Sequence, residues 1–219
     1  MNRGVVSGAS VSKQNQPGTC AKCHGGIVAE YSESVHAVAL RKGNMDSPVC
    51  TDCHGEHEIR DKNDPGSPIH ARNVAQQVCA SCHASVRLTR KYGLSTNAFQ
   101  TFSDSYHGLA ARGGSVSVVN CASCHSAHAI RSPLDPASSV NKDNLVRTCG
   151  QCHPGANARF AVGSVHVSAE APDGVGDSAI LRLIADLYVW FIVLVVGSMT
   201  LHNLADLLVA MTLPDRAAD

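Results

Sequence analysis

The sequence predicts a domain of loops and short α-helices that is built around bound groups rather than around a core of its own, followed by one C-terminal transmembrane α-helix. Three observations lead to this prediction. A Cys-x-x-Cys-His motif occurs five times, aromatic residues make up only 4% of the 219 residues, and a long apolar run lies near the C-terminus. A chain so poor in aromatic residues has little bulky apolar material with which to fill a core.

The five motifs contain all ten cysteines, so no thiol is left for a disulfide. Two thiols at this spacing can add to the two vinyl groups of one porphyrin, and the adjacent imidazole then binds the iron. Structural zinc sites use Cys-x-x-Cys pairs two at a time, which an odd number of pairs does not fit. We therefore predict five covalently bound haem c groups, numbered as sites 1 to 5 in chain order. The attachment residues are Cys20 and Cys23, Cys50 and Cys53, Cys79 and Cys82, Cys121 and Cys124, and Cys149 and Cys152; the proximal ligands are His24, His54, His83, His125 and His153.

Five porphyrins would supply the missing apolar bulk, so we expect the haem-bearing part to be loops and short helices wrapped around the haems. The rest of the chain divides by composition. We predict a flexible lead-in over residues 1–18, a pentahaem c-type cytochrome domain over 19–168, a linker over 169–177, a transmembrane helix over 178–212 and a short cytoplasmic tail over 213–219.

An internal repeat identifies candidates for the second, distal ligand of each iron. Residues 20–72 align with 79–143, and 149–166 begin a third copy, so a two-haem unit is duplicated and a fifth haem follows. A Ser-x-His element recurs in all three copies, and a second histidine follows the motifs of sites 2 and 4 by three residues. These shared positions predict five distal ligands, which are His36, His57, His107, His128 and His166.

Two assignments of these ligands remain open, because a histidine three residues after a proximal ligand lies on the same side of that haem and must reach a neighbour. In the first, sites 1 to 5 take His57, His36, His128, His107 and His166 in that order. In the second, His36, His107 and His166 stay at sites 1, 3 and 5, while His57 and His128 are exchanged between sites 4 and 2.

Other polar residues have two interpretations each. His70 falls where the second copy has Asn141, so it either binds iron or contacts solvent or a haem propionate. Four arginines keep their offsets between copies and suit propionate carboxylates, although ordinary solvated charges would look the same. These are Arg41, Arg60, Arg112 and Arg131.

Residues 187–201 contain no charge, and apolar residues continue beyond them, as a membrane-spanning helix requires. His202 and Asp206 lie in the second half of this span, where ionisable groups indicate function. A His-Asn pair resembles the b-type haem helices of membrane cytochromes. His202 is therefore a candidate ligand for a haem or a quinone, or else a helix-packing residue.

The sequence also indicates compartment and partners. Its formal net charge is zero, and no lysine-rich run is present, so nothing points to nucleic acid. Haem c is attached outside the bacterial inner membrane, so we expect a single-pass inner-membrane protein with its haems on the periplasmic side. The first 16 residues hold only the short apolar patch Val5-Val6, which is no ordinary signal peptide. Either the chain starts elsewhere or the later apolar segment directs insertion.

Iron with two protein ligands exchanges electrons and binds no substrate, so we expect an electron-transfer protein rather than an enzyme by itself. The motifs over residues 20–166 resemble those of multihaem bis-histidine c-type cytochromes. Five haems with one membrane helix are similar to the pentahaem subunit of alternative complex III, a quinol:acceptor oxidoreductase of respiratory or photosynthetic chains. That resemblance implies iron–sulfur and polytopic membrane subunits as partners, and a soluble or monohaem acceptor. The alternative is a stand-alone membrane-anchored multihaem quinol dehydrogenase that feeds periplasmic acceptors.

Overall fold

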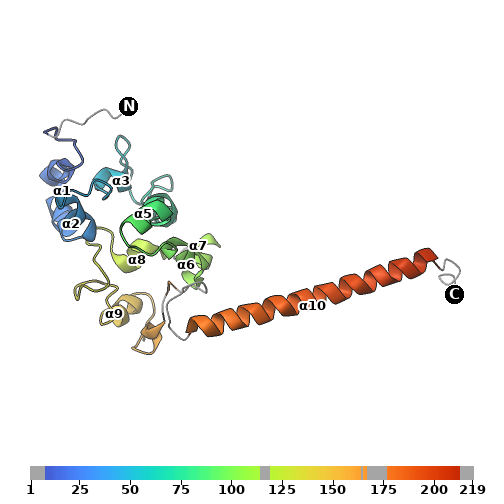
Figure 1. Ribbon diagram of the computed structural model, residues 1–219. Coiled ribbons are helices and arrows are strands. Elements are labelled where there is room, and N and C mark those ends of the chain that lie inside the picture. The colour runs from blue at the N-terminus through green and yellow to red at the C-terminus, as the bar shows by residue number, and fades with distance from the viewer. Residues whose placement is uncertain (1–7, 114–118, 164, 167–176, 213–219) are drawn as a thin grey trace. The chain divides into compact units, whose positions relative to one another are not determined.

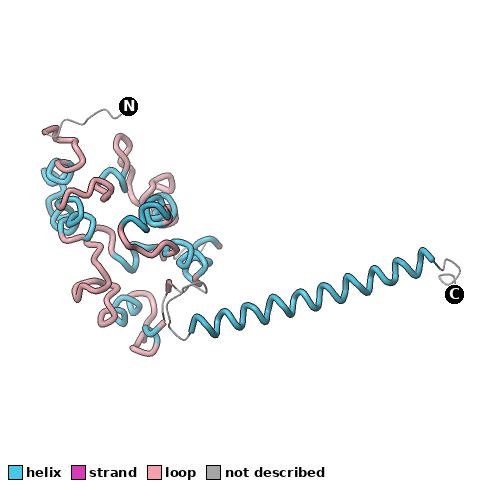
Figure 2. Tube along the Cα trace, in the orientation of Figure 1, coloured by secondary structure: helices cyan, strands magenta, loops and turns pink. Residues whose placement is uncertain are grey.

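The computed structural model describes residues 8–113, 119–163, 165–166 and 177–212. The chain divides into two compact units, Met1–His166 and Val167–Asp219. The described residues form helices joined by loops and contain no strand (Figure 2). This confirms the prediction of short helices and loops with an apolar C-terminal helix. The predicted linker up to residue 176 and the tail over 213–219 lie outside the described residues.

Short helices carry most of the motif residues and two of the predicted distal histidines, His36 and His107, in the first unit (Figure 1). The other three, His57, His128 and His166, lie outside the helices. Most of them last one or two turns, and long loops connect them. In chain order they are α1 (Gln16–Ser32), α2 (Val35–Arg41), α3 (Cys50–His54), the π-helix η1 (Val74–Cys79), α4 (Ala80–His83), α5 (Val86–Lys91), α6 (Ala98–Asp104), α7 (Tyr106–Arg112), α8 (Cys121–His125), α9 (Leu145–Gly150) and the 3₁₀-helix η2 (Phe160–Val162).

The first helix corrects one predicted boundary. α1 begins at Gln16, so it includes the last three residues of the predicted lead-in over 1–18. Pro17 is the reason, because proline signals a break inside a helix but is tolerated in its first turn, where no N–H is needed. The helix is interrupted at His24, whose φ of −111° and ψ of 41° are not helical. The first motif therefore ends at a kink in α1.

The motifs of sites 2 and 4 each form a single capped helical turn. In α3 the carboxylate of Asp52 accepts a 2.8 Å hydrogen bond from the N–H of Val49. In α8 the side chain of Asn120 accepts from the N–H of Ser123, and the side chain of Ser123 accepts from the N–H of Asn120. The cap is therefore reciprocal in α8 and one-sided in α3. Both caps stabilise the first turn, in which residues three apart lie on one helix face. Both cysteines of a motif are thus presented together.

Two matching helical hairpins position two of the predicted distal histidines. α1 packs beside α2, which carries His36, and α6 packs beside α7, which carries His107 (Figure 1). At each corner a serine caps the second helix: Ser34 accepts from the N–H of Ala37, and Ser105 accepts from the N–H of Gly108. The same bonds at equivalent residues give the two histidines equivalent supports.

Removing one of these caps should weaken the hairpin that it closes. We expect Ser34→Ala to destabilise the haem-loaded domain by about 1 kcal/mol, because a lost N-cap leaves a helix N–H without its partner. Ser34 is fully buried, so water cannot replace the hydroxyl. Urea titration of the variant measures the change.

Ser10→Ala is the matched control for this prediction, because Ser10 is exposed and caps no helix. Ser105→Ala should resemble Ser34→Ala in size. Equal midpoints for Ser34→Ala and Ser10→Ala would show that the cap contributes nothing.

The loops after sites 2 and 4 also repeat each other. Asn73 donates from its side chain to the carbonyls of Pro65 and Ser67, and Asn144 does the same to Pro136 and Ser138. Asp64 and Asp135 each accept from the backbone N–H two residues ahead. Both loops therefore satisfy their own polar groups without a helix or strand. Their side-chain donors and acceptors come from the same positions of each copy.

The first unit has almost no hydrophobic core of its own. Among the described residues, only four apolar side chains are buried, namely Ala37, Leu40, Val49 and Phe102. Large apolar side chains such as Leu134 and Val162 are more than four-fifths exposed. A domain of this length normally buries well over half of its unfolded surface. The polypeptide alone therefore lacks the apolar contacts that hold an ordinary domain together.

The second unit consists of α10 (Asp177–Thr212), a helix of 36 residues. At 1.5 Å per residue it is about 54 Å long, which exceeds the hydrocarbon thickness of a bilayer. Within it, Arg182–Thr212 has a mean hydropathy of 2.0 and is the one described segment long and apolar enough to cross a membrane. Its length and composition are the whole basis of this assignment.

Candidate metal centres

Four pairs of histidine rings face each other in the first unit. Each pair joins one motif histidine to one histidine of the predicted distal set. The ring centroids are 6.3 Å apart for His83 and His36, 6.2 Å for His54 and His128, 6.1 Å for His153 and His107, and 6.2 Å for His125 and His166. All of these pairs join segments that are distant in the sequence.

This spacing fits one iron atom between each pair of rings. An iron about 2 Å from each of two facing nitrogens, with each nitrogen about 1 Å from its ring centroid, separates the centroids by about 6 Å. Direct ring stacking would bring the centroids closer than this. The described residues hold no group of three or more His, Cys, Asp or Glu side chains that could bind a metal ion. Each pair therefore offers two imidazoles, which suit the two axial positions of a haem iron.

Two predicted ligands have no such ring contact among the described residues. His24 and His57 are both exposed, and neither faces another histidine ring. They are also the proximal and distal candidates that remain after the four pairs are formed. Ligation at site 1 by His24 and His57 therefore stays a prediction.

The ring contacts differ from both assignments that the sequence left open. Only the placement of His128 at site 2, part of the second assignment, agrees with the structure. His36 was expected at site 1 or 2 but faces His83 of site 3. The cause is α1, which continues from His24 to Ser32 and separates His36 from its own motif by about 12 Å of helix. His107 and His166 likewise face sites 5 and 4 rather than the sites assigned to them.

Burial favours the neutral form of four of the paired imidazoles, which is the form that binds metal. Burial lowers the pKa of His36 to about 4, and the nearby His83 adds to this effect. Burial also lowers the pKa values of His54, His83 and His125. The rings are therefore uncharged near neutral pH.

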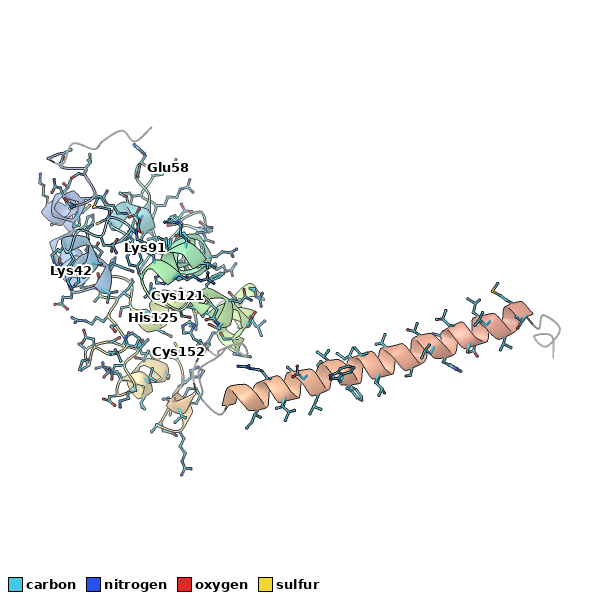
Figure 3. The ribbon with its side chains drawn as sticks, viewed as in Figure 1. Lys42, Glu58, Lys91, Cys121, His125 and Cys152 are labelled. Carbon is cyan, nitrogen blue, oxygen red and sulfur yellow. The ribbon has the colours of Figure 1, made fainter. Side chains whose placement is uncertain are left out.

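Cysteines of successive motifs lie close to one another. Burial and the neighbouring Cys20 thiol raise the pKa of Cys50 to about 11, and a hydrogen bond with Cys121 raises the pKa of Cys79. Burial, with a smaller effect of the nearby Cys82, raises the pKa of Cys53. Burial, with smaller effects of the nearby Cys149 and Cys152, raises the pKa of Cys124. Figure 3 shows Cys121 and His125 on α8, with Cys152 beyond α9. The attachment positions thus follow one another through the fold in sequence order, and no disulfide joins any of the ten cysteines.

The four repeat-matched arginines already have protein partners. Arg41 donates to the carbonyl of Ser32, and Arg112 donates to the carbonyl of Ser103, so each closes one of the two helical hairpins. Arg60 pairs with Glu58 and Asp64, while Arg131 pairs with Glu33 and Asp135. Propionate contacts for these arginines stay a prediction, and their shared offsets are explained by equivalent structural bonds.

The remaining two candidate histidines lie apart from the ring pairs. His70 occupies the turn before η1, where its Nδ1 accepts from the backbone N–H of Arg72 at 3.3 Å. His202 belongs to α10, and its Nε2 lies 3.4 Å from the carboxylate of Asp206. Iron or quinone binding by either residue stays a prediction.

Residues that the sequence did not single out contact two of the distal rings. A carboxylate oxygen of Glu30 lies 3.7 Å from Nδ1 of His128, and the hydroxyl of Thr101 lies 3.1 Å from Nδ1 of His166. Phe160 packs against the ring of His153. Glu30 and Thr101 come from helices far from these histidines in the chain. No sequence signal joins them, because only the crossing of segments brings them together.

Comparison with known proteins gives two weak similarities. Cytochrome c-type protein NrfB of Escherichia coli O6:H1 is 25% identical over 171 residues, which cover 74% of this chain and 80% of that protein. Multiheme cytochrome MtrA of Shewanella baltica (strain OS185) is 25% identical over 150 residues, which cover 68% of this chain and 35% of that protein. No family model and no solved structure matches the chain significantly. Five attachment motifs, four pairs of facing imidazoles and these similarities together support a multihaem c-type cytochrome with covalently bound haem c.

Proposed function

We propose that the chain is a membrane-anchored pentahaem c-type cytochrome that transfers electrons along a series of bis-histidine haems. The observation that carries this proposal is the set of four imidazole pairs with the separation that one iron requires. Haem c, when bound at these motifs, supplies one-electron redox chemistry at its iron.

The protein's own residues decide which chemistry is available. Two imidazoles at an iron leave no axial position for a substrate, so the paired histidines restrict their sites to electron exchange. The cysteines fix each site next to the one before it in the sequence. Such an arrangement supports electron entry near one end of the domain and exit near the other.

The membrane anchor supports the finer part of the proposal. α10 would hold the haem domain on the periplasmic side of a bacterial inner membrane, close to quinol-oxidising partners. A single helix offers no enclosed quinol pocket, so quinol oxidation would belong to other subunits. We therefore propose a subunit of a quinol:acceptor oxidoreductase of the alternative complex III type, with iron–sulfur and polytopic membrane subunits as partners.

Deleting residues 177–219 tests the anchor by itself. We expect this deletion to move the haem-stained protein from the membrane fraction to the soluble periplasmic fraction, because it removes all of the span of mean hydropathy 2.0. The His202→Ala variant should stay in the membrane, since it leaves the length of the span unchanged. Retention of the deleted chain in washed membranes would contradict anchoring by α10.

A native gel of source membranes in mild detergent tests the proposed complex. Haem staining locates the band, and mass spectrometry identifies the chains that migrate with this one. Iron–sulfur and polytopic membrane subunits in that band are the expected result. A small haem-stained band with this chain alone would overturn the complex and favour a stand-alone quinol dehydrogenase.

A further inference from the structure

Two distal histidines contact partners of different charge through the ring nitrogen that would face away from iron. His128 of site 2 has the carboxylate of Glu30 beside its Nδ1, at 3.7 Å. His166 of site 4 has the hydroxyl of Thr101 beside its Nδ1, at 3.1 Å. A histidine that binds metal through Nε2 retains an N–H at Nδ1, and the group beside that N–H tunes the ligand.

Glu30 is held near His128 by contacts between the two repeats. The backbone N–H of Val35, just beyond α1, donates to the carbonyl of Ile130 at 2.8 Å. Arg131 forms an ion pair with Glu33, one turn along the chain from Glu30. Together these contacts fix the C-terminal end of α1 against the segment that carries His128. At 3.7 Å the carboxylate acts mainly through its charge, because a hydrogen bond would be shorter.

Thr101 presents a neutral acceptor to His166. Its hydroxyl lies 3.0 Å from the carbonyl of Asn97 and 3.1 Å from that of Ala98, so its single proton is used within α6. The hydroxyl oxygen must therefore accept from the Nδ1–H of His166. Thr101 is 7% exposed and carries no charge, so it orients the ring without adding a negative potential.

We propose that Glu30 is a positioning residue that lowers the reduction potential of site 2 relative to site 4. A carboxylate beside the Nδ1–H makes an imidazole a more basic ligand, and its negative charge stabilises the more positive, oxidised iron. The side chains of Glu30 and His128 are 59% and 30% exposed, which limits the size of the effect. This inference rests on the proposed function, since it requires His54 and His128 to bind one iron.

Potentiometric titration of the full-length, haem-loaded protein, followed by electron paramagnetic resonance, tests the proposal. The rings of His54 and His128 are parallel within 2°, whereas those of the other three pairs are tilted by 47–52°. Ring orientation sets the anisotropy of a low-spin ferric signal, so the signal of site 2 should differ from those of sites 3, 4 and 5. We expect Glu30→Gln to move this signal alone to higher potential, by up to about 59 mV if the preference for oxidised iron falls tenfold.

Matched variants distinguish a specific role of Glu30 from a general effect of removing one negative charge. Glu58→Gln makes the same change of charge at an exposed residue that pairs with Arg60, and it should leave the site 2 signal at its wild-type potential. Glu30→Asp keeps the charge and should leave the reduction potential of site 2 close to its wild-type value. An unchanged potential in Glu30→Gln, or an equal shift at every site, would overturn the role of Glu30. A wild-type protein without low-spin signals from paired imidazoles would instead overturn the proposed function.

Discussion

Replacing His36 with alanine should convert one haem of five from low-spin to high-spin iron. His36 faces His83 at a centroid distance of 6.3 Å and lies on α2, far from its own motif. Without it, the iron at site 3 keeps only His83 as an axial protein ligand, because no third donor lies there among the described residues. Magnetic circular dichroism of the oxidised protein should show high-spin signal from about one fifth of the haem.

Two further variants control this experiment. His107→Ala should give a signal of the same size, because His107 has the equivalent place opposite His153. His70→Ala should leave all haems low-spin, since its ring contacts a backbone N–H rather than another histidine. Added imidazole should restore the low-spin state of the His36 variant. A fully low-spin His36→Ala protein would contradict ligation of site 3 by His36.

Preventing haem attachment should abolish the cooperative unfolding of the first unit. Only four apolar side chains are buried among its described residues, so the polypeptide cannot offset the conformational entropy of folding by itself. The loss would amount to the whole free energy of unfolding, about 5–15 kcal/mol for a domain. Chain produced without the haem-attachment machinery should show no thermal transition by circular dichroism and should be cleaved rapidly by protease.

The haem-loaded chain is the control, and we expect it to unfold in a sharp transition and to resist the same protease. The short helices should partly persist without haem, because caps such as those at α3 and α8 are local. A sharp transition in the haem-free protein would show that the polypeptide core is sufficient. In that case the bound haem would contribute little to the stability of the domain.

The sequence predicted most of what depends on local spacing and repetition. The short helices and loops and the apolar C-terminal helix follow from composition and motif spacing, and both are present in the described residues. The repeat also selected histidines that face a motif histidine, including His36 and His166, although their binding of iron stays a prediction. The helical turn at a motif follows from covalent geometry, because residues three apart on a helical turn lie on one face wherever the turn is placed.

The pairing of those histidines depends on how distant segments cross, which no local pattern records. α1 carries His36 away from site 1, and the α1–α2 hairpin then delivers it to site 3. Glu30 and Thr101 were missed for the same reason, since their partners lie 98 and 65 residues away in the chain. Propionate contacts stay a prediction for Arg41 and Arg112. Their matching offsets have a local cause, which is a hydrogen bond across a helical hairpin.

The proposed function is tested most directly by the electron paramagnetic resonance spectrum of the fully oxidised protein, combined with its haem content by mass spectrometry. We predict five haems per chain, all low-spin and all with two imidazole ligands, including a signal from the parallel rings of His54 and His128. Fewer than five haems, or a high-spin signal in the intact wild-type protein, would contradict it.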